Sequence, residues 1–226
     1  SSIDFALSCP KGVRRVTKTD PLDDWLSAQP AKVHRRSKRL LDVIREAYPI
    51  GVPALIVKSQ TDRLGDAGGY SFHLGTPDDV LRRICSWLLT HGEDRVLLEL
   101  IEGLWRRNGR EVVALAALLL ANLQTIGNVW IHLGNVIGNS STAEALLLSI
   151  EECLRAKHEI PSEELLVDWC QRSLAHSHLA LLVCHAAWVR AKRPALSPVL
   201  IEIFSNIDYP DGDSLLVRVR DQMLES

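Results

Sequence analysis

The chain has 226 residues, of which 46% are hydrophobic and 24% are charged, and its formal net charge is −2. This is the ordinary composition of a soluble globular protein, it is long enough to bury a real core, and the net charge does not demand a polyanionic partner. The longest apolar runs, residues 112–123 and 179–189, are too short to cross a bilayer, and the chain does not open with a secretory signal pattern. We therefore expect a cytoplasmic protein without a membrane partner.

Charge and cysteine usage refine this picture. Residues 1–50 hold ten Lys or Arg against six Asp or Glu, so this segment is net positive and the rest of the chain is net negative. Such a charge distribution is compatible with binding to nucleic acid. The five cysteines are odd in number and irregularly spaced, and four of them fall inside apolar helical patterns. Free cysteine in such a pattern behaves as a small hydrophobe, which favours a reducing compartment.

Residues 1–30 are polar and are interrupted by three prolines, which predicts an irregular N-terminal arm. Three apolar side chains of this arm are expected to pack on the domain: Phe5, Leu22 and Trp25. Apolar residues then recur at helical spacing in residues 33–47 and roughly 53–64, so we expect the folded domain to span residues 31–226.

The next two helices show clear amphipathic patterns. In "DDVLRRICSWLL" the apolar side chains recur at three and four, and Thr76 is expected to cap a helix whose first position is Pro77. In "DRVLLELIEGLWRRNG" a second apolar stripe includes Trp105, and Gly109 is expected to stop the helix.

The second half of the chain continues as helices. "REVVALAALLLANL" is apolar nearly all round, as is "HSHLALLVCHAAWVRAK", so both are expected to be buried between neighbours. The sequence "STAE" predicts a capping box between Ser141 and Glu144, and Pro161 is expected to start a further helix. Ser197 and Pro198 begin another, and "DSLLVRVRDQML" ends the chain.

The alternation of an amphipathic helix with an all-apolar one occurs repeatedly. "LIEGLWRRNGREVVALAALLLAN" and "LVDWCQRSLAHSHLALLVCHAAWV" share the order apolar pair, Trp, basic residues, turn and apolar helix. Helix pairs that stack only on their neighbours are the plan of HEAT-type solenoids. The sequence therefore predicts an all-α fold, an α-α superhelix of HEAT-like helix pairs.

Two segments resemble a known family. "YSFHLGTPDDVLRRICSWL" resembles the aromatic-Leu-Gly-x-x-Pro opening of the HEAT-like DNA-alkylation-repair glycosylases, and "LIEGLWRRNGREVVALAALLLANL" is similar to that family's next unit. The resemblance covers roughly residues 34–190. It implies a C-shaped stack whose concave face cradles duplex DNA, and an enzyme that excises cationic alkylated bases with tryptophans and one catalytic Asp.

The catalytic position gives a direct test of that activity. A carboxylate beside the sugar stabilises the cationic transition state of base excision. In the family the Asp follows a Trp by about four residues, which here places Gly134 or Asn135 after Trp130, with no Asp or Glu between Glu111 and Glu144. A later Arg pair that helps to hold phosphate is replaced by His176 and His178. We therefore carry over no catalytic residue, and an active enzyme would need another acid, such as Asp62 or Asp168.

The candidate DNA-contacting residues are cations and the polar or aromatic side chains near Trp130. On one predicted helix Arg35, Lys38 and Arg39 share a face that suits phosphates, and "WRRNGR" offers a second cluster. Trp130 either stacks on DNA or fills the core. The predicted set is Arg35, Lys38, Arg39, Arg106, Arg107, Arg110, Trp130, His132, Asn135 and His178.

A metal site and cofactor chemistry find little support. The one metal-like group lacks tight ligand pairs, and buried cysteine with surface histidine explains it better. Its members are Cys170, His176, His178, Cys184 and His185. The chain contains no P-loop, G-x-S-x-G, G-x-G-x-x-G or H-E-x-x-H motif, so we expect neither a metal nor a cofactor.

Three functions remain open: a non-catalytic DNA-binding module, an active glycosylase that uses another acid, and a HEAT-type scaffold for a protein partner. Arg35, Arg39, Arg106 and Arg107 converging on a concave surface would favour duplex DNA, whereas an apolar or acidic groove would favour a protein.

Overall fold

The computed structural model describes residues 19–51, 76–138, 141–191, 196–209 and 214–225. In these residues the regular structure is helical and there is no strand, which confirms the all-α prediction. The predicted helix at 53–64 and the start of the "YSFHLGTPDDV" motif lie outside the described residues. The helices in chain order are α1 (Pro21–Ser27), η1 (Ala31–Arg35), α2 (Ser37–Ile50), α4 (Asp78–His91), α5 (Asp94–Arg107), α6 (Arg110–Asn122), α7 (Val129–Val136), α8 (Ala143–Arg155), α9 (Glu163–Cys170), α10 (Leu174–Arg190), α11 (Pro198–Ser205) and α12 (Ser214–Leu224).

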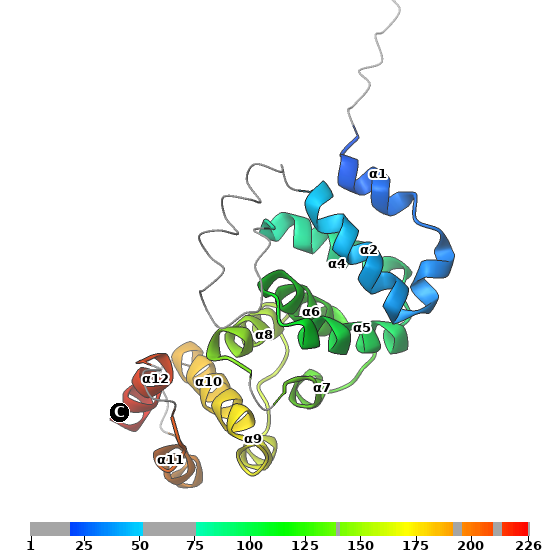
Figure 1. Ribbon diagram of the computed structural model, residues 1–226. Coiled ribbons are helices and arrows are strands. Elements are labelled where there is room, and N and C mark those ends of the chain that lie inside the picture. Colours follow the sequence, from blue (N-terminus) through cyan, green and yellow to red (C-terminus); the bar gives the residue numbers. More distant parts are fainter. Residues whose placement is uncertain (1–18, 52–75, 139–140, 192–195, 210–213, 226) are drawn as a thin grey trace, which may run out of the picture.

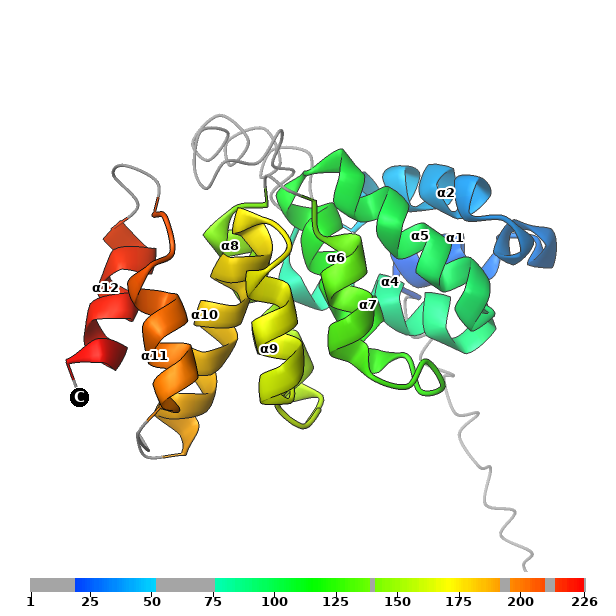
Figure 2. The ribbon, with the colours of Figure 1, turned by 90° about the horizontal axis from the view of Figure 1, so that it is seen from below.

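The helices stack in two rows that follow the order of the chain. In one row, α6 packs on both α4 and α8, and α10 packs on both α8 and α12. In the other row, α2 packs on α5 and α5 packs on α7. Helices of the two rows pair as α5 with α6, α9 with α10 and α11 with α12, and Figure 2 shows this succession from α2 to α12.

One apolar core runs through the stack, from Leu22 in α1 to Met223 in α12. The helices α6 and α10 are buried on almost every side, as their sequences predict, because neighbouring helices surround them. The amphipathic helices bury the predicted stripe; in α5, for example, Leu100 and Leu104 are fully buried.

The N-terminal arm is more regular than predicted. Residues 21–27 form α1, whose N-cap Asp20 accepts a hydrogen bond from the Leu22 backbone N at 2.8 Å. Leu22 and Leu26 are buried, and Arg83 of α4 bridges to Asp20 at 2.6 Å and to Asp23 at 2.8 Å. The predicted packing of Leu22 is thus confirmed, whereas the irregular arm is wrong for these seven residues, because Pro21 suits the first turn of a helix and Asp20 caps it. Figure 1 shows α1 beside α2 and α4.

The predicted helix at 33–47 is broken near its start. Residues 31–35 form a 3₁₀-helix, and Arg36 has an extended backbone (φ −142°, ψ 125°) before α2 begins at Ser37. Arg35 therefore does not share a helix with Lys38 and Arg39, and the prediction that the three lie on one helical face is wrong.

Four helix ends differ from the predictions by one or two residues. Asn108, not Gly109, takes the left-handed conformation after α5, because an asparagine tolerates it.

The three other differences are at helix starts. Thr142, not Ser141, caps α8, since its hydroxyl accepts from the Ala145 backbone N at 3.3 Å while Ser141 Oγ accepts from Trp105 Nε1. The start of α9 is capped by Ser162 rather than initiated by Pro161. The predicted cap Thr76 is buried, and α4 begins at Asp78 without a side-chain cap.

An ion network joins two helices that each pack on α6. Arg82 of α4 bridges to Asp78 at 2.9 Å and to Glu152 of α8 at 3.1 Å. Glu152 also accepts from Arg155 at 2.9 Å. The network thus spans α4 and α8.

None of the helices that the structure describes is both long and apolar enough to span a membrane.

Candidate nucleic-acid interface

Trp130 lies in the core. Asn128 caps α7 by accepting a hydrogen bond from the Trp130 backbone N at 3.0 Å. The Trp130 residue is 2% exposed, and its indole Nε1 donates to the backbone carbonyl of Glu159 at 2.6 Å. A buried indole whose N–H already has a partner does not present a face to a base, so Trp130 is a packing residue here.

Gly134 is one of the two positions at which the resemblance would place the catalytic acid, and a second tryptophan, Trp169, lies against it. A Cβ atom added to Gly134 would lie 2.6 Å from Trp169 Nε1, and the Gly134 carbonyl accepts a hydrogen bond from His176 Nε2 at 2.7 Å. No side chain fits at position 134 without displacing Trp169. Asn135, the other candidate position, is exposed on α7.

An acidic residue from a distant segment, Glu159, lines the same hollow as Trp130. A hollow of about 400 Å³ is lined by the α6–α7 turn and the α8–α9 turn, and Glu159 and Trp130 both contribute to its wall. The contact that links Glu159 to Trp130 is made by the Glu159 backbone carbonyl, and the Glu159 residue is exposed. No Lys or Arg lines this hollow, so it offers no countercharge to a phosphate.

The histidines of the predicted set serve mainly as internal hydrogen-bond partners. His132 Nε2 bonds to the Ile126 carbonyl at 2.8 Å, and His178 Nε2 bonds to the Asp208 carbonyl at 3.1 Å. His178 is 5% exposed, so it does not reach a surface ligand, contrary to the prediction. His185 bonds to Gln222, and His176 bonds to Gly134. Among the described residues no three His, Cys, Asp or Glu side chains are grouped to hold a metal ion.

His176 is held in its neutral form by its surroundings. Its Nε2 must donate to the Gly134 carbonyl, so in the neutral ring Nδ1 accepts from the Ser173 hydroxyl at 2.6 Å. Burial lowers the pKa of His176 from its ordinary value of 6.5, and this effect outweighs the hydrogen bond to the Gly134 carbonyl, which acts in the opposite direction.

The N-terminal cations form an exposed group that we call the basic strip. Its five members are Lys32, Arg35, Arg36, Lys38 and Arg39, which lie on η1, on the extended residue that follows it and on the first turn of α2. All five are exposed, and none forms an ion pair with an acid in the described part of the chain. Arg45, further along α2, is by contrast paired with Asp42 at 3.7 Å.

The second basic cluster lies further along the same pair of helices. Ser37 bonds to Glu99, and a Cβ on Gly103 would meet Leu41 at 3.1 Å, so α2 and α5 run parallel. Arg106 and Arg107 therefore lie beside the second half of α2, beyond the basic strip.

The three arginines of the second cluster have different surroundings. Arg106 is exposed, whereas Arg107 is half-buried and its charge acts on the buried Tyr48. Arg110 lies 4.0 Å from Glu144. The two clusters follow one another along α2 and α5 and do not converge on one spot.

A group of aromatic rings next to the basic strip was not predicted from the sequence. His34 of η1 lies 4.5 Å from Trp87 and 5.1 Å from His91 of α4, measured between ring centroids. We call these three residues the ring cluster. Trp87 and His91 are four apart on one helix, but nothing in the sequence places His34 beside them.

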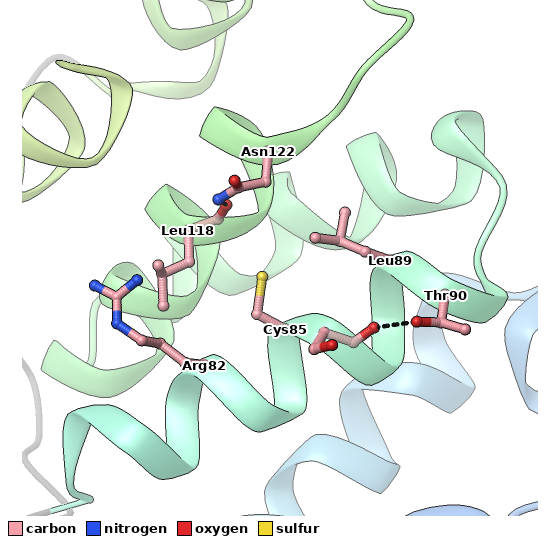
Figure 3. A pocket seen from close by; sticks show the side chains of 7 residues that line it. Arg82, Cys85, Leu89, Thr90, Leu118 and Asn122 are labelled. Atoms are coloured by element: carbon pink, nitrogen blue, oxygen red, sulfur yellow. Dashed lines mark hydrogen bonds between the residues drawn. The ribbon is translucent and has the colours of Figure 1, made fainter. Parts of the chain in front are cut away.

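A hollow between α4 and α6 is lined by Arg82, Cys85, Ser86, Leu89, Thr90, Leu118 and Asn122 (Figure 3). Its volume is about 340 Å³, and two of its polar side chains are bonded to the backbone: Asn122 donates to the Leu118 carbonyl and Thr90 to the Ser86 carbonyl, both at 2.7 Å. Burial raises the pKa of Cys85 to about 12, so its thiol stays protonated and is a poor nucleophile.

Comparisons with known proteins leave the family open. No family model, no curated protein and no solved structure matches this chain.

Proposed function

We propose that this chain is a non-catalytic nucleic-acid-binding module of HEAT-like helix pairs, which holds the DNA backbone through the basic strip. The observation that carries the proposal is the exposure of five cations within eight residues, none with an acidic partner in the described residues. Cations without internal partners are available to phosphates, and releasing the counterions of DNA favours their binding. The free thiols of the four described cysteines support a reducing, cytoplasmic location.

The proposed module does not excise bases, and the surroundings of Trp130 support this part of the proposal. Excision in the resembled family needs a tryptophan face and a carboxylate at the lesion. Here the Trp130 indole is 2% exposed and position 134 is filled by the Trp169 ring. Neither requirement is met at the positions that the resemblance indicates.

Salt-dependent binding tests the proposal. Fluorescence anisotropy with a labelled duplex, with and without an abasic site, should show an affinity that falls steeply as salt rises. The double variant Arg35→Gln/Arg39→Gln should bind at least about tenfold more weakly and with a shallower salt slope, by roughly 0.9 for each phosphate that is no longer neutralised. The matched control Arg172→Gln/Arg190→Gln removes the same charge from exposed arginines elsewhere in the stack and should bind nearly as well as the unmodified chain.

The outcomes separate the alternatives. No binding to the duplex at low salt would remove the nucleic-acid proposal and favour a scaffold for a protein partner, for which the exposed Val199 and Ile201 of α11 are an apolar surface. Equally weakened binding in the two double variants would mean that total charge, and not the basic strip, governs binding.

The hollow beside Trp130 supports a second candidate, a glycosylase that uses Glu159 as its acid. Glu159 lines that hollow with an exposed side chain, and this candidate would not use Trp130, whose indole is buried, as a stacking surface. Release of an N-alkylated purine from duplex DNA, abolished by Glu159→Gln and kept by Glu163→Gln, would establish it. No release by the unmodified chain would dismiss it.

A further inference from the structure

The ring cluster is built from two elements that lie far apart in the sequence. The 3₁₀-helix η1 packs on α4, and this packing places the His34 ring against Trp87 and His91, which lie one turn apart on α4. His34 is buried, Trp87 is half-buried and His91 is exposed. The cluster therefore begins in the core and ends with an aromatic ring at the surface.

The ring geometry is suited to stacking and not to metal binding. The His34 and His91 rings are stacked, with an angle of 22° between their planes, and Trp87 is tilted by 54° against His34 and by 48° against His91. A metal ion is bound by nitrogen lone pairs that lie in the ring planes and converge on one point, which stacked rings do not provide. His91 Nδ1, moreover, already bonds to the Trp87 carbonyl at 2.9 Å.

The cluster lies directly beside the basic strip. Lys32 and Arg35 belong to the same 3₁₀-helix as His34, and both are exposed. Aromatic rings next to a row of cations are the combination by which proteins hold single-stranded nucleic acid, because cations follow the backbone and rings stack on the bases. In a regular duplex the faces of the bases are covered by their neighbours, so the rings would have nothing to stack on.

We propose that the ring cluster receives an unpaired nucleobase, which stacks at Trp87 and His91 while the basic strip holds the phosphates on either side. This inference rests on the proposed function, since it takes the basic strip to be the backbone-binding surface. It adds the kind of nucleic acid that is preferred: a single strand, or a duplex with an unpaired or extruded base, over a fully paired duplex.

Competition between matched oligonucleotides tests the inference. Anisotropy is measured with a labelled single strand, with its fully paired duplex and with the same duplex carrying one unpaired base. We expect the single strand and the interrupted duplex to bind more tightly than the paired duplex. His91→Ala and Trp87→Leu should each weaken the single strand by roughly 5- to 100-fold and leave binding of the paired duplex nearly unchanged.

His185→Ala is the matched control, because His185 is also next to a tryptophan, Trp188, with a centroid distance of 5.9 Å, but lies on α10 at the other end of the stack. This variant should bind all three oligonucleotides like the unmodified chain. Circular dichroism checks the fold of each variant, and exposed His91 provides a readout even if Trp87→Leu unfolds.

The results distinguish the inference from the function on which it rests. If the unmodified chain binds none of the three oligonucleotides, the proposed function fails. If it binds through the basic strip but does not discriminate between paired and unpaired bases, or if His91→Ala and a folded Trp87→Leu leave single-strand affinity unchanged, the inference fails and the proposed function stands.

Discussion

The tryptophan and histidine side chains around Trp130 and those of the ring cluster have different surroundings. Trp130 and Trp169, with His176, are buried between α7, α9 and α10, and the donors Trp130 Nε1 and His176 Nε2 are bonded to backbone carbonyls. The ring cluster instead ends at the surface, next to five cations. The same residue types are thus core in one place and a candidate binding surface in the other, and burial and neighbouring charge make the difference.

The largest expected effect comes from removing a buried ring. Trp130→Ala should lower the free energy of unfolding by about 3–5 kcal/mol, because it opens a cavity and leaves the Glu159 carbonyl without its donor. His91→Ala, at the exposed end of the ring cluster, should cost less than about 1 kcal/mol. Urea unfolding followed by circular dichroism measures both free energies. A destabilisation by His91→Ala as large as that by Trp130→Ala would contradict the difference between the buried Trp130 and the exposed end of the ring cluster.

The second largest effect is expected at Gly134, one of the two positions at which the resemblance would place a catalytic acid. Gly134→Asp should destabilise the chain by about 1–3 kcal/mol or more, since its Cβ would lie 2.6 Å from Trp169 Nε1 and its charge would be buried. The control Asn135→Asp places the same side chain one residue later on an exposed position and should change stability by less than about 0.5 kcal/mol. Equal unfolding midpoints for the two variants would show that position 134 is more open than the structure indicates.

The smallest expected effect is a pH dependence that both groups share. Burial lowers the pKa of His176 and of His34 below the ordinary value of 6.5, so the unfolded chain binds more protons than the folded chain in the window just below pH 6.5. For His34 the neighbouring His91 acts in the same direction. Their contribution to stability is therefore complete above about pH 6.5 and is lost as the pH falls from there toward the lowered values.

Urea midpoints measured between pH 8 and pH 5 test this dependence. The fall should be shallower in His176→Gln, which has no titrating group at that position. A flat profile in the unmodified chain would show that neither imidazole resists protonation in the fold. Asp20, whose pKa is lowered mainly by its hydrogen bond to Arg83, acts only at lower pH, where its carboxylate begins to be protonated.

Much of the fold could be predicted because it follows from local pattern. The spacing of apolar residues predicted most of the described helices of the domain, apart from η1, and identified α6 and α10 as buried. Helix ends were less certain, because adjacent residues compete for the same role: Ser141 and Thr142 both carry a hydroxyl, and only packing against Trp105 leaves the cap to Thr142. The helix in the arm begins with local signals, Asp20 and Pro21, which the prolines and polar residues around them obscured.

The candidate site was harder to predict, for a related reason. The basic strip could be found because its members are neighbours in the sequence. Its aromatic partners could not, since only the packing of η1 on α4 brings His34 to Trp87. Glu159 was overlooked in the same way, because the α8–α9 turn meets α7 only in the folded chain. Sequence spacing predicts which side chains share a helix, and it does not predict which helices meet.

The salt bridge between Arg82 and Glu152 has a consequence for how the stack opens. In arrays of helix pairs, opening usually spreads only between adjacent units. Here α4 and α8 are tied to one another across α6, so amide protons of both helices should exchange with solvent as one cooperative unit. Glu152→Gln should uncouple them, and deuterium uptake in α4 would then rise although the substitution lies two helices away.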